Sequence, residues 1–424
     1  MNSRERVRKT IRFEEPDRVP LDLGGSICTS ICAGAYNQLK KYLGLSGIGA
    51  PEIWEVFTMT VRVQEPIIER FGLDVIPIGR RRDVMGFTRT GWKPWRLPSD
   101  GSEILMPGDF CFEEMEDGGY RAYPARMGRP GPWSFCMPKG GHYFDPPASS
   151  GAALMDAVTA EAPRVDLKKA RESLDEIEVD PADLEHFRNE SRHYYENTDY
   201  SLLAEGMQIG LPAGEGIAYL TNTIIQIRQD PDYVHEMFDV TAEEAIRRLR
   251  PFLDAIEDRC DVILVTCCDF GNQQNEFIDP DMFREFYVAP YKKVNDYIHK
   301  HSNMKTMFHV CGAVSRLIPH FIEAGVDILN PVQTMARGMD PENLKRQFGD
   351  KIVFWGGGAE TQTTLPLGSA ADVAAEVKER MRIFKPGGGF VFNPVHNIQD
   401  LVPPENIVAA YDAAREAGLY DKAR

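Results

Sequence analysis

Short apolar runs that alternate with amphipathic stretches are the feature that most limits the fold of this chain. In the C-terminal half the runs lie at 262–265, 307–308, 326–329, 352–355 and 390–392. They are rich in β-branched and aromatic residues and are largely apolar on both faces, as parallel strands are when helices cover both sides of a sheet. Strands and helices therefore alternate every roughly 20–45 residues, which is typical of a parallel α/β architecture.

Helix boundaries in this half are marked by local signals. Asp-Pro pairs at 230–231, 279–280 and 340–341 each place an N-cap carboxylate before a proline suited to the first helical turn. Gly325 and Gly349 stand where helices are expected to end. Further candidate strands at 19–21, 74–78 and 202–204 bring the number to about eight, which predicts a (β/α)8 TIM barrel. The alternative, a doubly wound open sheet, is weakened because no G-x-G-x-x-G turn follows the first strand.

The domain organisation is predicted to be one barrel domain over residues 1–424, with a β-rich insertion at 80–150. The insertion is rich in glycine, proline and aromatic residues, which indicates short antiparallel strands and turns. Its aromatic side chains are expected either to roof a flat ligand or to form a small core of their own. Residues 161–190 carry an acidic helical pattern.

Composition narrows the class of protein. The chain has 424 residues, 43% of them hydrophobic and 26% charged, as in ordinary globular proteins. Its net charge of −16 argues against nucleic acid or an anionic membrane as the main partner. No apolar run approaches the ~20 residues that span a bilayer, and no signal-peptide pattern follows the charged N-terminus. Eight cysteines are too sparse for a disulfide scaffold, so a cytoplasmic location is expected.

A His-x-Cys pair is the strongest chemical signal. His309 ends an apolar run, Cys311 follows two residues later, and His396 closes the run at 390–395. Imidazole nitrogen and thiolate sulfur both bind a soft metal ion such as Zn²⁺. A buried cysteine or histidine can also serve packing alone, but strand ends of a barrel converge on one mouth. We therefore predict a zinc site made by His309, Cys311 and His396.

Other polar residues end the same series of strands. Asp269 and Glu360 are candidate catalytic residues, and Glu360 is also a candidate fourth metal ligand or a partner that orients an imidazole. Asn330 and Gln333 are candidate substrate-binding residues. Of the adjacent Cys267 and Cys268, at most one can face the barrel mouth, because neighbouring side chains on a strand point in opposite directions.

Several stretches of the chain resemble the uroporphyrinogen decarboxylase superfamily. These stretches lie at residues 6–20, 308–312, 325–333, 348–352 and 387–392. The resemblance as a whole extends over most of the chain and is clearest at residues 260–420. The resemblance implies a (β/α)8 barrel, in agreement with the strand rhythm.

Two branches of that superfamily are relevant. The decarboxylases themselves are metal-free, and their arginine-rich N-terminal substrate loop has no counterpart here. The other branch, which is similar to methylcobamide:coenzyme M methyltransferases, carries a zinc motif of His-x-Cys followed far downstream by cysteine. His309 and Cys311 match its first two positions, whereas His396 stands where the motif has the second cysteine.

Replacing a thiolate by a neutral imidazole leaves a bound metal less neutralised and hence a stronger Lewis acid, better suited to polarising an ether or alcohol oxygen. The resemblance and this difference together predict a zinc-dependent methyltransferase working in the demethylating direction. It would move a methyl group from a methoxy-type substrate to a corrinoid (cobalamin). The chain lacks the corrinoid-binding Asp-x-His-x-x-Gly pattern, so a separate corrinoid protein would carry that cofactor and dock around the barrel mouth.

Two other functions stay open at this stage. One is a uroporphyrinogen decarboxylase-like lyase that acts on a tetrapyrrole or another carboxylated substrate, with Asp269 as its best support. The other is a non-catalytic barrel that binds a corrinoid or a metal. A homodimer is compatible with the apolar surfaces of the predicted helices.

Overall fold

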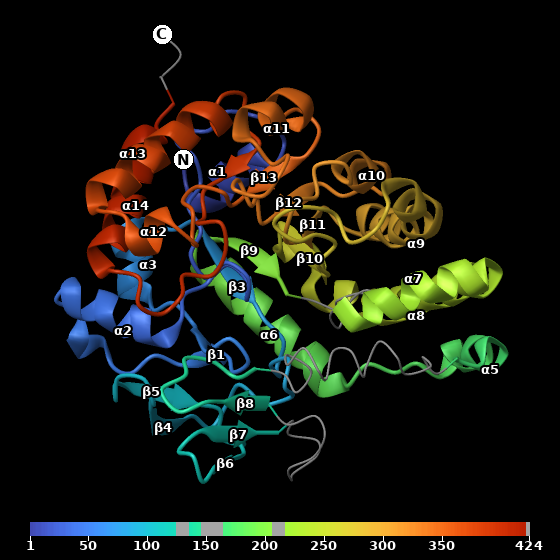
Figure 1. Cartoon of the computed structure of the whole chain (residues 1–424), viewed down its shortest axis with the longest axis horizontal. Helices are drawn as coiled ribbons and strands as arrows, with labels where there is room; N and C mark the ends of the chain where they lie inside the picture. The colour runs from blue at the N-terminus through green and yellow to red at the C-terminus, as the bar shows by residue number, and fades with distance from the viewer. Residues whose placement is uncertain (124–134, 146–163, 206–216, 421–424) are drawn as a thin grey trace.

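A seven-stranded parallel sheet forms the centre of the molecule (Figure 1). The computed structural model describes residues 1–123, 135–145, 164–205 and 217–420. Within them the strand order is β14-β13-β12-β11-β10-β9-β3. The strands are β3 (Val75–Ile78), β9 (Ser201–Ala204), β10 (Val262–Cys267), β11 (Lys305–His309), β12 (Ile328–Asn330), β13 (Val353–Trp355) and β14 (Phe390–Val391).

An eighth segment closes the sheet into a ring. Leu21 pairs in parallel with Phe392, where the N–H of Phe392 donates to Pro20 O at 2.9 Å and the N–H of Asp22 donates to Phe392 O at 2.8 Å. On its other side, Leu21 O accepts from the N–H of Asp74 at 2.8 Å, next to β3. Residues 20–22 therefore lie between β14 and β3, and the predicted TIM-like barrel is confirmed.

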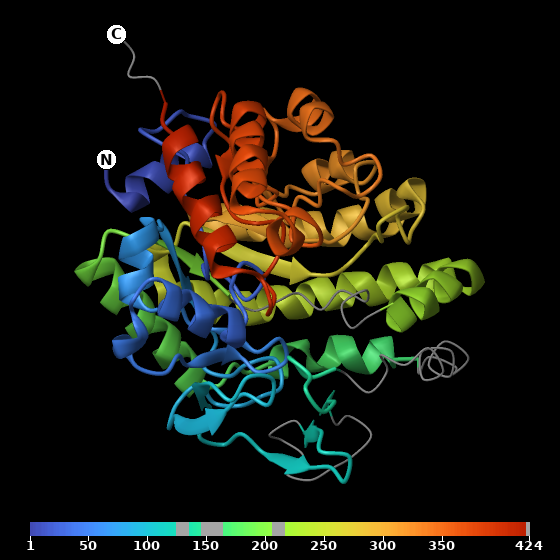
Figure 2. The ribbon, with the colours of Figure 1, turned by 60° about the vertical axis from the view of Figure 1, so that its left-hand side comes forward.

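Helices cover the outside of this ring (Figures 1 and 2). The α-helices are α1 (Ser3–Thr10), α2 (Ala33–Tyr42), α3 (Glu65–Phe71), α5 (Leu167–Glu172), α6 (Pro181–Asn197), α7 (Ile217–Gln229), α8 (Pro231–Ile256), α9 (Pro280–His301), α10 (Ile318–Glu323), α11 (Pro341–Phe348), α12 (Thr364–Leu367), α13 (Ala370–Phe384) and α14 (Pro404–Ala417). The three predicted Asp-Pro starts are confirmed, since Asp230, Asp279 and Asp340 accept backbone N–H bonds at the starts of α8, α9 and α11. The described part of the acidic pattern, residues 164–190, contains α5, the 3-10 helix η3 (Ser173–Glu176) and the first part of α6, and residues 161–163 lie outside the described residues.

The inside of the barrel is filled by one apolar cluster. It comprises inward side chains of seven strands together with Val7 and Ile11 at the end of α1: Val75, Leu203, Val262, Leu264, Met307, Ile328, Val353, Trp355 and Val391. Arg8 of α1 bonds Asp261, and Thr10 O accepts from the N–H of Gly389, so α1 lies against residues that immediately precede strands. Helix α1 therefore closes the N-terminal end of the barrel and leaves the C-terminal end for polar groups.

The insertion forms a separate β layer at the bottom of both ribbon views (Figures 1 and 2). It contains the antiparallel pair β4 (Lys93–Arg96) and β5 (Glu103–Met106), and the antiparallel sheet β6 (Phe112–Glu114), β7 (Tyr120–Ala122) and β8 (Phe135–Met137). A further antiparallel pair, β1 (Ile53–Glu55) and β2 (Thr60–Val61), lies in the chain between the closing segment at 20–22 and β3. Trp95 packs edge-on against Phe110, Phe112 and Tyr120. These aromatic side chains form a small core of the insertion, the second of the two expectations.

Among the described helices, none is both long enough and apolar enough to cross a membrane.

Candidate metal centre

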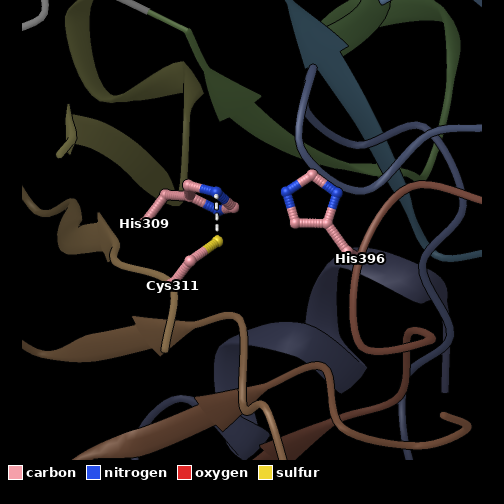
Figure 3. A group of neighbouring side chains, drawn as sticks. All are labelled: His309, Cys311 and His396. Atoms are coloured by element: carbon pink, nitrogen blue, oxygen red, sulfur yellow. Dashed lines mark hydrogen bonds between the residues drawn. The ribbon is translucent and has the colours of Figure 1, made fainter. Parts of the chain in front are cut away.

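His309, Cys311 and His396 meet at the C-terminal end of the barrel (Figure 3). His309 is the last residue of β11, Cys311 follows it by two, and His396 lies in the segment between β14 and α14. One ligand atom from each side chain lies within 4.8 Å of the others. Sγ of Cys311 is 3.6 Å from Nε2 of His309, and the two imidazole rings are 5.1 Å apart between centroids. The predicted convergence of these three residues is therefore present in the structure.

Strand alternation explains why the site lies above the apolar interior. Met307 of β11 and Ile328 of β12 both point into the barrel. Side chains two positions further along a strand lie on the same face, which directs His309 and Asn330 into the mouth. The polar site therefore begins where the apolar filling of the barrel ends.

The proton of His309 is positioned by Asn330. Nδ2 of Asn330 donates to the carbonyl of Trp355 at 2.8 Å, so its Oδ1 faces His309 as an acceptor, 2.6 Å from Nδ1. Nδ1 must then carry the ring proton, and the lone pair lies on Nε2, the atom that faces Cys311. Burial lowers the pKa of His309 and outweighs the opposing effects of Asp269 and Asn330. The imidazole is thus neutral and has its ligand atom turned toward the thiol.

His396 is also held neutral. Burial, and next the proximity of His309, lower the pKa of His396 to about 3. Its Nδ1 accepts a hydrogen bond from the N–H of Asn397 at 2.8 Å, and its other ring nitrogen, Nε2, faces His309 and Cys311 (Figure 3). With Nδ1 accepting, the ring proton is on Nε2, so coordination of the neutral imidazole through this atom requires that the proton move to Nδ1 and that the bond from Asn397 break.

Cys311 is connected to Asp269, the candidate catalytic carboxylate. The N–H of Cys311 donates to Oδ1 of Asp269 at 3.0 Å. Burial raises the pKa of the Cys311 thiol, and the carboxylate of Asp269 raises it further. The thiol is therefore protonated without a metal, and binding a cation there would release a proton.

The donor set fits Zn²⁺. Zinc–nitrogen bonds of 2.0–2.1 Å and zinc–sulfur bonds of about 2.3 Å in a tetrahedron separate the two donor atoms by about 3.6 Å. The Sγ–Nε2 distance between Cys311 and His309 is 3.6 Å. Three protein donors, one of them soft, are also the usual number in catalytic zinc sites, which keep one position for a ligand from solution.

The other predicted site residues differ in how they are connected to this centre. Asn330 is buried and supports His309 rather than lining an open surface. Oε1 of Gln333 accepts a hydrogen bond from the N–H of Gly312. Glu360 lies outside the three-residue group, where its carboxylate accepts from Thr334 at 3.5 Å and from the N–H of Gln362 at 3.3 Å. The geometry thus favours Asn330 as a positioning residue and gives no support for Glu360 as a ligand, and the catalytic and substrate-binding roles stay predictions.

Residues 26–32, which we call the cross-strap, are a part of the site that the sequence did not indicate. The N–H of Ser30 donates to Oδ1 of Asn397 at 2.7 Å, and Nδ2 of Asn397 donates to Ile27 O at 2.9 Å. The cross-strap therefore fixes the residue that follows His396. The sequence of residues 26–32 has neither helical nor strand periodicity. Their contact with Asn397 is therefore apparent only in the folded structure.

A cavity of about 340 Å³ lies elsewhere on the barrel, with Arg62, Gln64, Ile76 and Tyr194 among its lining residues. None of the three candidate metal ligands lines it. The chemistry of the donor set, rather than cavity size, therefore locates the candidate site.

Comparisons with known proteins agree with this architecture. The family described as uroporphyrinogen decarboxylase (URO-D) matches residues 211–417. A curated relative, "Uroporphyrinogen decarboxylase" of Thioalkalivibrio sulfidiphilus (strain HL-EbGR7), is 25% identical over 194 residues, which is 45% of this chain and 50% of that protein. The chain thus spans about half the length of the curated relative that it matches. Among solved structures, a methyltransferase from Methanosarcina mazei aligns with a TM-score of 0.54 and 15% identity, over 98% of this chain and 99% of that one. The last comparison shows a shared fold along nearly the whole chain.

Proposed function

Since this chain belongs to the uroporphyrinogen decarboxylase superfamily, we propose that it is the zinc-dependent, methyl-transferring kind of barrel rather than a metal-free decarboxylase. Its substrates would be a small methylated compound, of the methoxy type, and the corrinoid of a partner protein. The observation that supports this proposal is that two neutral imidazoles and one thiol meet at the barrel mouth.

The protein's own residues would hold and orient the metal. His309 and Cys311 supply a preorganised pair, because Asn330 fixes the tautomer of His309 and Asp269 binds the backbone of Cys311. His396 supplies the third donor from the opposite side of the mouth (Figure 3). When bound, zinc supplies Lewis acidity toward the oxygen that leaves the methyl group.

The apolar interior of the barrel contributes a dry floor. Met307 and Trp355 are fully buried in the cluster that lies N-terminal to His309 along the strands. Excluding water on that side protects a reactive corrinoid and strengthens the electrostatic effects of the polar groups above. The methyltransferase from Methanosarcina mazei has the same fold, so this scaffold is compatible with methyl transfer.

Zinc content is the first test. Purified full-length protein is expected to contain one zinc per chain, and His309→Ala and Cys311→Ala are expected to lose it. Cys136→Ala is a matched control, because Cys136 is a partly buried thiol on β8 of the insertion. Metal-free wild-type protein, or unchanged zinc in both ligand variants, would contradict the proposal.

Methyl transfer is the second test. Zinc-loaded protein is mixed with free Co(I) cobalamin and a panel of methoxylated compounds, and formation of methylcobalamin is followed by its absorption spectrum. Transfer that depends on Cys311 supports the proposal. Tight corrinoid binding without methyl transfer would favour the non-catalytic barrel that binds a corrinoid.

A decarboxylase is the second candidate, because the matching family and the curated relative both carry that name. It predicts carbon dioxide release from uroporphyrinogen by protein from which metal has been removed. The loss of that activity in Asp269→Asn but not in Cys311→Ala would favour the decarboxylase.

A further inference from the structure

Cys28 and Cys267 form a pair of thiols beside the candidate metal centre. Sγ of Cys28 is 3.7 Å from Sγ of Cys267. Cys28 is buried on the cross-strap, and Cys267 is the partly buried last residue of β10. The two residues are 239 positions apart in the chain, so the fold alone brings them together.

A β-bulge directs Cys267 into the barrel mouth. The register of β10 against β11 shifts between Leu264 and Thr266. Cys267 therefore packs on the interior cluster, whereas Cys268 is buried in the outer core and receives a hydrogen bond from Thr266. Cys267 is thus the member of the adjacent pair that meets Cys28.

The cross-strap connects this pair to the His396 segment. The N–H of Ile27 donates to Oε1 of Glu205 at 2.5 Å, next to β9. Three residues later the strap binds Asn397 through the N–H of Ser30, and Ser30 O accepts from the N–H of Ile398 at 2.9 Å. Moving Cys28 therefore moves a segment that holds the neighbour of His396.

We propose that Cys28 and Cys267 are a redox-active dithiol that hydrogen peroxide converts to a disulfide across the barrel mouth. A disulfide requires a sulfur–sulfur distance of about 2.05 Å, so the two atoms must approach by about 1.7 Å. Cys28 lies in a turn in which the N–H of Thr29 donates to Ser26 O. A loop turn can accommodate such a shift more easily than the strand that carries Cys267.

The reaction balances with one peroxide per pair. The sulfur of Cys267 gives up its proton and attacks one peroxide oxygen, the O–O bond breaks, and Cys267 becomes a sulfenic acid, while the hydroxide that leaves takes up a proton to become the first water. The sulfur of Cys28 then attacks the sulfenic sulfur, the S–S bond forms, and the oxygen leaves as water with the proton of Cys28. In total two thiols and one hydrogen peroxide give one disulfide and two waters. Cys267 is only partly buried whereas Cys28 is buried, so peroxide reaches Cys267 first and Cys28 serves as the second thiol.

The consequence for the metal centre rests on the proposed function. The disulfide would fix the cross-strap to β10 beside Cys311 and change the position of Asn397 next to His396. We therefore expect oxidised protein to bind zinc more weakly than reduced protein.

Peptide mapping of full-length protein tests the disulfide directly. The protein is treated with hydrogen peroxide, free thiols are alkylated, and a tryptic digest is analysed by mass spectrometry. The expected product joins peptide 19–40, which contains Cys28, to peptide 260–284, which contains Cys267, and dithiothreitol separates them. A link from either peptide to 306–316, which contains Cys311, as the main product would overturn the proposal.

Single variants assign the two sulfurs. Cys28→Ser and Cys267→Ser are each expected to abolish the link between the two peptides. Cys32→Ser and Cys268→Ser are the matched controls, because these buried thiols lie on the same two peptides and should leave the link intact. A link that persists in Cys28→Ser, or that disappears in Cys32→Ser while this variant stays folded by circular dichroism, contradicts the assignment.

The mapping is repeated in Cys311→Ala to separate this inference from the zinc proposal. The link between 19–40 and 260–284 should still form, whether or not the chain binds zinc. If it forms and zinc is absent from wild-type protein, the dithiol stands and the metal function fails. If wild-type protein contains zinc and no link forms, the metal function stands and the dithiol inference fails.

Discussion

Nδ1 of His309 lies 2.6 Å from Oδ1 of Asn330, and this contact decides which nitrogen of His309 can bind a metal. The amide of Asn330 cannot turn around without losing the bond from its Nδ2 to the carbonyl of Trp355. Its oxygen therefore faces the ring, the ring proton stays on Nδ1, and Nε2 remains a ligand atom.

The variant Asn330→Ala is expected to weaken zinc binding roughly 10- to 100-fold, because the tautomer and the ring orientation of His309 would no longer be fixed. A competition titration with a chromogenic chelator measures the affinity. Asn406→Ala is the matched control, since this buried asparagine donates to the carbonyls of Leu365 and Gly368 and to none of the three ligands. Equal losses of affinity in the two variants would point to general destabilisation instead.

The identity of the third donor offers a second prediction. His396→Cys is expected to keep one zinc per chain, because a thiolate is a good zinc ligand, whereas His396→Ala should bind zinc more weakly. The additional negative charge should reduce the Lewis acidity and slow demethylation of methoxy donors roughly tenfold or more. Metal content and transfer to free cobalamin are measured on the same samples. Equal rates in wild-type and His396→Cys protein would show that the imidazole does not set the direction of the chemistry.

Most of the barrel could be predicted from the sequence because its elements are marked locally. Three helices begin at the N-cap residues Asp230, Asp279 and Asp340, and the buried strands are recognisable as short apolar runs. The closing strand could be proposed only as a candidate, since at Leu21 it consists of a single parallel bridge flanked by backbone hydrogen bonds.

The site was predictable in part, for a physical reason. His309 is the last residue of β11 and Cys311 follows it by two residues, so their approach is set by local geometry. The roles of Asn397 and Cys28 depend on the cross-strap, whose course is set by hydrogen bonds to residues more than a hundred positions away. The expectation for Glu360 came from its place at a strand end, but its side chain bonds within its own loop and to Thr334.

Closure of the barrel floor by α1 predicts a stability effect that is separate from the site. Ile11 is almost fully buried in the interior cluster at the N-terminal end of the strands. Ile11→Ala should lower the free energy of unfolding by about 2–5 kcal/mol, because it removes buried methyl groups and leaves a cavity. Urea denaturation measures this, and zinc content should not change. Ile225→Ala on α7 is the control, since this side chain is 40% exposed and its loss should cost under about 0.5 kcal/mol.

Asp22 predicts a pH dependence of stability. Its carboxylate is fully buried and accepts from Nε1 of Trp355 at 2.7 Å and the N–H of Gly25 at 2.7 Å. Burial raises its pKa from the ordinary value of 3.8 to about 6. An acid with a raised pKa binds its proton more tightly in the folded chain, so its stabilising contribution is full below pH 3.8 and is lost as the pH rises to about 6.

Asp22→Asn removes this titration. Relative to the wild type, the variant should therefore gain roughly 2–3 kcal/mol in unfolding free energy as the pH rises from about 3.8 to above 6. Urea denaturation of both proteins at pH 4.5 and pH 7.5, roughly the span over which this carboxyl titrates, shows most of this change. A difference between the two proteins that is the same at both pH values would mean that Asp22 does not titrate in this range.

Asp327 should behave in the opposite way. Its carboxylate is 2.6 Å from Nε2 of His299 and 2.8 Å from Nζ of Lys305, and it accepts from the N–H of Thr306 at 2.9 Å. Burial alone would raise its pKa, but the bonds from His299 and Lys305 outweigh this and lower it. An acid with a lowered pKa stabilises the fold above its ordinary pKa of 3.8, and the contribution is lost as the pH falls through the folded-state value. Asp327→Asn should therefore destabilise the protein by about 1–3 kcal/mol at both pH 7.5 and pH 4.5. In the same denaturation series, a destabilisation that disappears by pH 4.5 would show that the carboxylate is protonated in the folded state well above pH 3.8, and that its ion pairs do not hold it ionised.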